Sequence, residues 1–290
     1  MGSAWIAPVV VGVDGSASSL SAVRLAARHA SSYGCSLHIV HAFNWLPRWP
    51  EATGADPAGG AAAHEVVRRA ASAAHEAAPG VVTVTRLLEG AATSTLLRLA
   101  RTAVLLAVGD GGLSGQVCLP TRTSAVHIAA RAACSVLVAR RTAAHGGPIV
   151  VGVNGSSASE HALDFAFDTA VRQRAELVVV RATAADPPTG DEWREVNDLV
   201  APRQHKYHLT ARIRVLPGEP QAVLVAASMR AGLVVIGARG NQPYRGLLGS
   251  AAQTLLHHSP APVILVRGMM PPPLEASDPH TAARSRAVPR

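Results

Sequence analysis

The glycines in residues 233–267 are spaced for binding an anion. Gly237 and Gly240 follow an apolar, β-branched run, and Gly249-Ser250 precede an alanine-rich stretch with helical periodicity. Glycine accepts positive φ and lets backbone N–H groups approach a ligand, while the first turn of a helix presents free N–H groups and a positive dipole end. This β-loop-α-β pattern therefore predicts a phosphate site.

A repeat places this unit within a larger pattern. VVVGVDGSASS at 9–19 returns as IVVGVNGSSAS at 149–159, an offset of 140 residues, so the chain is a tandem duplication. Each copy begins with an apolar strand, turns at Gly-Ser and enters a helix through serines suited to N-capping. Alternating strands and helices then predict parallel sheets covered on both faces.

The elements expected in each copy follow the same order. We expect further strands at 36–42, 81–88, 104–109 and 136–140, and at 176–182, 210–216, 233–237 and 263–267. Besides the first helix of each copy, we expect helices at 61–78 and 91–102, and at 192–204 and 221–231. The loops expected after the second strands are 46–60 and 183–190.

Two loops of each copy should meet at one edge of the sheet. The turn after the first strand carries Asp14 or Asn154, and the glycine loop follows the fourth strand. In a doubly wound sheet these two segments flank the switch point where ligands bind. A carboxylate or amide can bond a ribose or a base edge, and the loop can hold phosphates through N–H groups. Together they predict a nucleotide site.

Three motifs of the chain resemble a known family. The first-strand VGVDGS, the Gly-x2-Gly-x9-Gly-Ser/Thr loop and the following LLHHSPAPVILVR resemble the universal stress proteins in their tandem form, over about 9–140 and 149–267. The resemblance implies an α/β fold of two tandem, doubly wound, five-stranded parallel sheets of order 3-2-1-4-5, with helices on both faces. It also implies ATP binding, as in many members, and stress-response regulation rather than dedicated catalysis.

Matched residue by residue, the resemblance gives both copies a set of expected nucleotide contacts, to which the loop arginine Arg239 is added because its place in the sequence suits neutralising phosphate. In the second copy the contacts are Val153, Asn154, Ala182, Gly237, Arg239, Gly240, Gly249, Ser250 and Ala251. In the first copy they are Val13, Asp14, Ala42, Gly109, Gly112 and Thr123.

Each copy departs from the family pattern. In the first copy, Arg122-Thr123 replace the closing Gly-Ser. We expect Arg122 to block the phosphate site, because arginine is strained at positive φ and its side chain fills the space for the phosphates. The alternative is that Arg122 makes a charged contact to phosphate. In the second, Gly249-Ser250 remain but only eight residues separate them from Gly240, and Asn154 weakens any role in holding Mg²⁺. We predict the second copy as the better ATP site.

Other chemistry-bearing residues have simpler interpretations. The chain contains no GxSxG, HExxH or P-loop motif, so we expect no dedicated enzyme, and ATP held or hydrolysed slowly. His257-His258 point apart on a helix, and His38, His41 and Cys134 fit core or edge packing, so no metal site is expected. The odd cysteine count without CxxC spacing favours reduced thiols in a cytoplasmic protein.

Charge and composition give weaker indications about partners. The net charge is +8, but the cations are almost all arginines spread along the chain, with Lys206 the only lysine, so a specific nucleic-acid partner is not expected. The first apolar run is too short to span a membrane and has no basic region before it.

The sequence thus predicts three segments and one preferred function. Residues 1–145 and 146–270 form two domains that pack as an intramolecular pseudo-dimer through their fifth strands, with a further homodimer possible, and 271–290 form a disordered tail. The preferred function is an ATP-binding stress regulator with an unknown protein partner. The alternatives are an interaction scaffold whose sites have decayed, and a slow ATP hydrolase.

Overall fold

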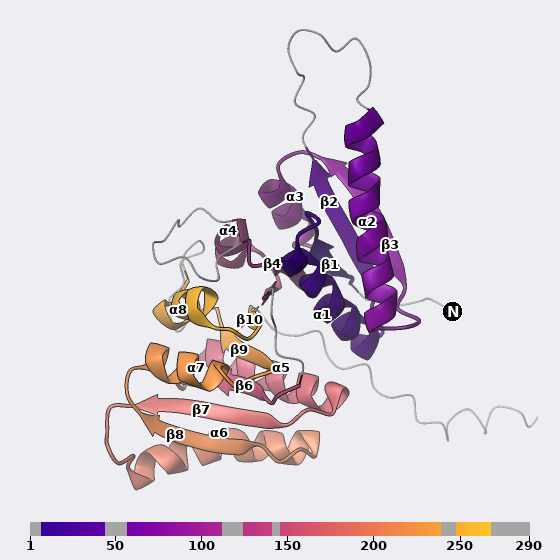
Figure 1. Ribbon diagram of the computed structural model, residues 1–290. Coiled ribbons are helices and arrows are strands. Elements are labelled where there is room, and N and C mark those ends of the chain that lie inside the picture. The colour runs from indigo at the N-terminus through magenta and orange to yellow at the C-terminus, as the bar shows by residue number, and fades with distance from the viewer. Residues whose placement is uncertain (1–6, 44–56, 112–123, 141–145, 239–247, 268–290) are drawn as a thin grey trace, which may run out of the picture.

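The protein contains one ten-stranded sheet with helices on both faces (Figure 1). The computed structural model describes residues 7–43, 57–111, 124–140, 146–238 and 248–267. The predicted tail, residues 271–290, lies outside these ranges.

The elements of the two halves follow the same order. The first half contains β1 Val9–Gly12, α1 Ala17–Tyr33, β2 Leu37–Phe43, α2 Pro57–Ala77, β3 Thr83–Glu89, α3 Ala92–Leu99, β4 Leu105–Gly109, α4 Ser124–Arg131 and β5 Ser135–Ala139. The second half contains β6 Ile149–Gly152, α5 Ser157–Gln173, β7 Leu177–Thr183, α6 Gly190–Tyr207, β8 Arg212–Pro217, α7 Pro220–Ser228, β9 Leu233–Gly237, α8 Ser250–His258 and β10 Val263–Val266.

The strand order is β3-β2-β1-β4-β5-β10-β9-β6-β7-β8. Within each half all pairs are parallel and the expected order 3-2-1-4-5 is confirmed. The halves join through their fifth strands, which pair antiparallel, with Leu137 opposite Ile264. The two expected sheets are therefore one continuous sheet, and the fifth strands are the contact edges that the sequence predicts.

Two apolar cores lie on opposite faces of this sheet, because side chains alternate along each strand. The core under α1, α2, α5 and α6 includes Val9, Val11 and Phe167. The core under α3, α4, α7 and α8 includes Val10 and Leu255. Both cores extend across both halves, so the halves share their packing as well as their strand hydrogen bonds.

Two arginines connect the halves reciprocally at the centre of the sheet. Arg140 directly follows β5, and its Nη2 donates to the Leu255 and Leu256 carbonyls in the last turn of α8, both at 2.8 Å. Arg267 follows β10, and its Nη2 donates to the carbonyls of residues 129 and 130 in α4, at 2.7 and 2.8 Å. The Leu255 carbonyl also accepts from Ser259 N at 3.0 Å, so Arg140 adds a second donor there. Carbonyls of a last helical turn mostly lack intrahelical partners, so each arginine caps a helix of the opposite half.

Two helices start earlier than the sequence predicts. α2 begins at Pro57 instead of residue 61, which corrects the loop expected at 46–60, because proline suits the first turn of a helix. α6 covers Gly190–Tyr207 instead of 192–204, and a capping box between Thr189 and Glu192 fixes its start. Within the described part of the chain, no helix has both the length and the apolar character needed to cross a bilayer.

Candidate nucleotide site

A cleft of about 200 Å³ lies at the carboxyl ends of β6, β7 and β9. The predicted second-half residues that line it are Val153, Asn154, Ala182, Gly237, Gly249, Ser250 and Ala251. They come from four separate stretches of sequence, which the parallel strands bring to one edge. Arg239 and Gly240 were also predicted here and lie outside the described residues.

The first turn of α8 opens onto this cleft. Gly249 is the N-cap residue and has no side chain to cap the helix, and among the described residues no side chain accepts a hydrogen bond from the first amides of α8. These N–H groups are therefore available to an anion, in the arrangement that the sequence predicts.

The reason for glycine at this position differs from the expected one. Gly249 has φ −64° and ψ 155°, an extended conformation that every residue type adopts. The argument that Arg122, its counterpart in the other copy, would be strained at positive φ is therefore wrong for the backbone seen at Gly249. The expectation that the Arg122 side chain fills the space for the phosphates does not depend on φ. Arg122 itself lies outside the described residues.

Glycine at the end of the fourth strand of each half is required by close packing. A Cβ on Gly237 would lie 2.7 Å from the Ala158 carbonyl oxygen, and one on Gly109 would lie 2.8 Å from the Ser19 nitrogen. Neither residue is among the glycines with positive φ. These glycines let the first turns of α5 and α1 approach the strand end, which brings the turn after the first strand to the cleft.

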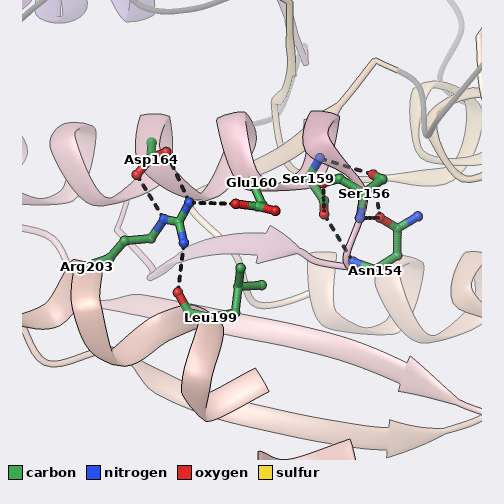
Figure 2. Close-up of polar contacts among 7 residues, drawn as sticks. All are labelled: Asn154, Ser156, Ser159, Glu160, Asp164, Leu199 and Arg203. Atoms are coloured by element: carbon green, nitrogen blue, oxygen red, sulfur yellow. Dashed lines mark hydrogen bonds and ion pairs between the residues drawn. The ribbon is translucent and has the colours of Figure 1, made fainter. Parts of the chain in front are cut away.

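Asn154 is held by the serines of the α5 N-terminus (Figure 2). Its Oδ1 accepts hydrogen bonds from Ser156 N at 3.1 Å and Ser156 Oγ at 2.7 Å, and its own N–H donates to Ser159 Oγ at 3.4 Å. Ser156 Oγ also accepts from Ser159 N, which confirms the predicted serine N-cap. In Figure 2 the Asn154 Nδ2 points away from this network. It has no hydrogen bond to another described residue, so it can donate to a ligand.

The helix carrying these serines is fixed by an arginine from the neighbouring helix α6. Arg203 Nε and Nη2 donate to the two Asp164 oxygens at 2.9 and 3.2 Å, and Nη2 also donates to Glu160 at 3.3 Å (Figure 2). Its Nη1 donates to the Leu199 carbonyl of α6 at 2.8 Å. Planar guanidinium groups suit such multiple contacts. Arg203 therefore ties α5 to α6 close to the turn that holds Asn154.

The backbone at the end of β7 also faces the cleft. Val180 O accepts a hydrogen bond from Val153 N, and β6 pairs with β7 no further than Gly152 opposite Val180. Backbone groups of a strand alternate in direction, so those of Ala182 point the same way, beyond the end of β6. One donor and one acceptor are thus directed into the cleft.

The equivalent cleft of the first half measures about 380 Å³. It is called the first cleft below, and the cleft that contains Asn154 the second cleft. Val13, Asp14, Ala42 and Gly109 line it, as predicted, together with Gly111 and residues of α3 and α4. Gly112 and Thr123, also predicted here, lie outside the described residues.

Among the described lining residues, the first-half cleft carries a negative charge that the second-half cleft lacks. Burial raises the pKa of Asp14, but hydrogen bonds from Ser16 and Ser19 outweigh this effect and lower it below its ordinary value. The Asp14 carboxylate accepts from Ser16 N at 2.9 Å. Asp14 is therefore ionised at neutral pH, whereas Asn154 in the second cleft is neutral.

Several residues missed by the sequence reasoning support these clefts. The sequence predicts only packing for His41, but its Nδ1 lies 2.7 Å from the Val13 carbonyl oxygen, so it donates to the backbone of a predicted site residue. Val180 and Leu224 form apolar walls of the second cleft. Val180 lies two positions before Ala182, so the alternation along β7 could have identified it.

The described linings contain few groups for acid–base chemistry. The second cleft is lined by apolar, hydroxyl, amide and glycine residues, and Asp14 is the one ionisable residue in the described lining of the first. Within the described ranges, no group of three or more His, Cys, Asp or Glu residues is arranged to hold a metal ion. The arrangement suits binding of a polar ligand through backbone groups.

Comparisons with known proteins cover both halves. The model of the universal stress protein family matches residues 6–140 and 147–267. A universal stress protein of Mycolicibacterium smegmatis is 31% identical, with 89% of this chain and 96% of that protein covered. A universal stress protein of Mycobacterium tuberculosis is 30% identical, again with 89% and 96% covered.

A solved structure has the same fold. The crystal structure of a universal stress protein from Archaeoglobus fulgidus has a TM-score of 0.69, with 15% identity, and the match covers 90% of this chain and 98% of that chain.

Proposed function

Because the chain belongs to the universal stress protein family, we propose that its second-half cleft binds an adenine nucleotide, ATP or AMP, and that the bound nucleotide regulates contact with a protein partner. The observation that carries this proposal is the convergence of four stretches on one cleft: the Asn154 turn, the end of β7, the end of β9 and the open N-terminus of α8.

The parts of the cleft suit the parts of a nucleotide. Val180, Leu224 and Ile236 offer apolar walls for a base, and the backbone of Ala182 offers the donor and acceptor that a purine edge requires. Asn154 Nδ2 suits a ribose hydroxyl or a phosphate oxygen. The uncapped amides of α8 suit phosphate.

The size of the cleft limits which part of the nucleotide is enclosed. Small-molecule pockets usually measure about 300–1,000 Å³, and this cleft measures about 200 Å³. We therefore expect the base and sugar to be enclosed and a phosphate chain to extend over the start of α8.

The residues present do not favour a protein-held Mg²⁺ in this cleft. Asn154 Oδ1 already accepts two hydrogen bonds from Ser156, and an amide oxygen carries no net charge. We expect nucleotide affinity in the second cleft to change less than about threefold between Mg²⁺ and EDTA, a free-energy difference below about 0.7 kcal/mol.

We infer weaker binding in the first cleft. Its ionised Asp14 repels phosphate unless a cation lies between them. If the inference is correct, Asp14→Asn will strengthen nucleotide binding there in the absence of Mg²⁺.

Isothermal titration with ATP and AMP tests the proposal. Gly249→Arg should weaken binding at least about tenfold, because the backbone at Gly249 tolerates arginine while the side chain enters the phosphate region. The matched control is Gly190→Arg, at an exposed position of the same half where a Cβ meets no atom within 4 Å. Wild-type protein that binds neither nucleotide, or equal affinities for the two variants, would refute the proposal.

We do not expect turnover to be the function. The described lining offers no general base to position water against a terminal phosphate. Phosphate release from ATP should therefore stay at background and be unaffected by Ser250→Ala. Release that depends on Ser250 would favour the slow hydrolase instead.

A further inference from the structure

A groove separate from both nucleotide clefts lies between the two halves. It measures about 610 Å³, and none of its described lining residues lines either cleft. One wall is the face of α1 that carries Leu20, Arg24 and Arg28, and the floor includes Leu137 of β5 and Ile264 of β10. The opposite wall contains Gly146, Gly147, Ile149, Gln173, Ala175, Gly232 and Leu233 of the second half. This volume is within the usual range for small-molecule sites, about 300–1,000 Å³.

The groove has an apolar floor and a cationic side, and Ser21, His29 and Gln173 also line it. Arg24 and Arg28 lie one helical turn apart on α1, with Arg24 half-buried and Arg28 exposed. Within the described ranges, neither guanidinium group has a hydrogen bond or an ion pair. Two such groups beside apolar residues fit an anion that carries an apolar body.

The repeat shows that this charge is specific to one side. At an offset of 140 residues, Arg24 and Arg28 correspond to Asp164 and Asp168 of α5. Both aspartates are neutralised within their own half, Asp164 by Arg203 at 2.9 Å and Asp168 by Arg172 at 2.9 Å. The charge at these positions is therefore reversed between the copies, and only the arginines lack a partner among the described residues.

The repeat also explains why space remains on this side. By the same offset, Leu25 and Gln173 of the groove correspond to Phe165 and Tyr33. Those two aromatic rings stack on His29, with centroids at 5.8 and 4.3 Å, and fill the contact between α1 and α5. The smaller side chains at the equivalent positions leave the groove open.

We propose that the groove between α1 and the second half binds a small organic carboxylate with an apolar body, which Arg24 and Arg28 hold by its charged end while the residues of β5, β10 and β9 contact its apolar part. The ligand class follows from the two guanidinium groups, the apolar floor and the volume. The proposal does not depend on nucleotide binding.

Octanoate and its neutral counterpart 1-octanol are suitable probes, with binding measured by isothermal titration on the full chain. Wild-type protein should bind octanoate saturably and 1-octanol at least about tenfold more weakly. Arg24→Ala with Arg28→Ala should weaken octanoate binding about tenfold or more. The charge-matched control is Arg98→Ala with Arg101→Ala, two exposed positions remote from the described lining of the groove, and it should bind as the wild type does.

A filled variant tests the place of binding. Leu25→Phe with Gln173→Tyr copies the aromatic residues of the opposite side and should abolish octanoate binding, with circular dichroism to verify folding. Gly249→Arg should bind octanoate normally, which separates this site from the nucleotide cleft. The proposal is overturned if the wild type shows no saturable binding, if 1-octanol binds equally well, or if the Arg24 and Arg28 variant matches its control. It is equally overturned if the folded filled variant still binds; if that variant does not fold, the arginine variant decides.

Discussion

Replacing Arg140 by methionine should destabilise the protein although it removes a buried charge. The side chain is 2% exposed, and burial lowers its pKa below the ordinary arginine value while nearby Asp110 acts in the opposite direction. Its Nη2 bonds two α8 carbonyls, whereas Nε and Nη1 have no hydrogen-bond partner among the described residues, Nη1 lying 3.9 Å from Asp110 Oδ2. Arg140→Met therefore removes both the stabilising hydrogen bonds and the destabilising burial of a charge.

The favourable contribution is the larger one. Two charge-assisted hydrogen bonds contribute about 1.5–3 kcal/mol each. Their loss removes the arginine donor from the Leu256 carbonyl, whereas the Leu255 carbonyl keeps its bond from Ser259 N. Relief of the desolvation cost offsets part of this loss, and breaking a buried charged contact typically costs about 3–5 kcal/mol in total. We expect Arg140→Met to lower the free energy of unfolding by about 3 kcal/mol. Arg267→Met should cost less, because Arg267 makes equivalent contacts but is only half-buried.

Urea unfolding followed by circular dichroism measures this difference. The matched control is Arg98→Met, an exposed arginine of α3 whose replacement should change the stability by less than about 0.5 kcal/mol. If Arg140→Met is as stable as the control, or more stable than the wild type, the desolvation cost of the guanidinium exceeds the contribution of its hydrogen bonds and the reasoning fails.

Three further predictions concern packing, pH and reactivity. Gly237→Ala should lower the free energy of unfolding by about 1–3 kcal/mol, because its Cβ would lie 2.7 Å from a carbonyl oxygen. Gly190→Ala, at a position with open space around it, should not lower it. Equal melting temperatures of the two variants would contradict this prediction. Burial lowers the pKa of His29 from 6.5 to about 4. Between these two pH values the unfolded chain binds a proton that the folded chain does not. The free energy of unfolding should therefore decrease as the pH falls, by about 1.4 kcal/mol per pH unit and about 3 kcal/mol in total. His29→Phe should lose this dependence, and an unchanged urea profile against pH would contradict the assignment. Burial raises the pKa of Cys134 to about 11, so peptide mass mapping should find it unmodified by thiol reagents at pH 7.4 until the protein is unfolded; rapid labelling of the folded chain would count against its burial.

The sequence predicts the strand order because local patterns and the repeat both carry it. Apolar runs such as residues 149–152 identify buried strands, and the Gly15-Ser16 and Gly155-Ser156 turns mark the helix starts. The starts of α2 and α6 were missed although Pro57 and the Thr189 capping box are local signals. These errors are therefore errors of interpretation.

Other features depend on contacts that no local pattern carries. The need for glycine at Gly237 arises from α5, whose Ala158 lies far away in the sequence. The contacts of Arg140 with α8 exist because the two fifth strands pair antiparallel, which sets the helix of one half over the arginine of the other. The groove beside α1 depends on how Leu25 and Gln173 are placed across the two halves.

The pairing of β5 with β10 also has a consequence for mass action. Ala139 ends β5 and Ile149 begins β6, so the two halves are joined by a short segment and their association is intramolecular. For short linkers the effective concentration is of the order of millimolar, well above the concentration of most proteins in solution. Dilution therefore does not uncover the fifth strands, in contrast to a sheet shared by two separate subunits. The cleft that contains Asp14 and the cleft that contains Asn154 consequently remain in a one-to-one ratio at every concentration of the protein.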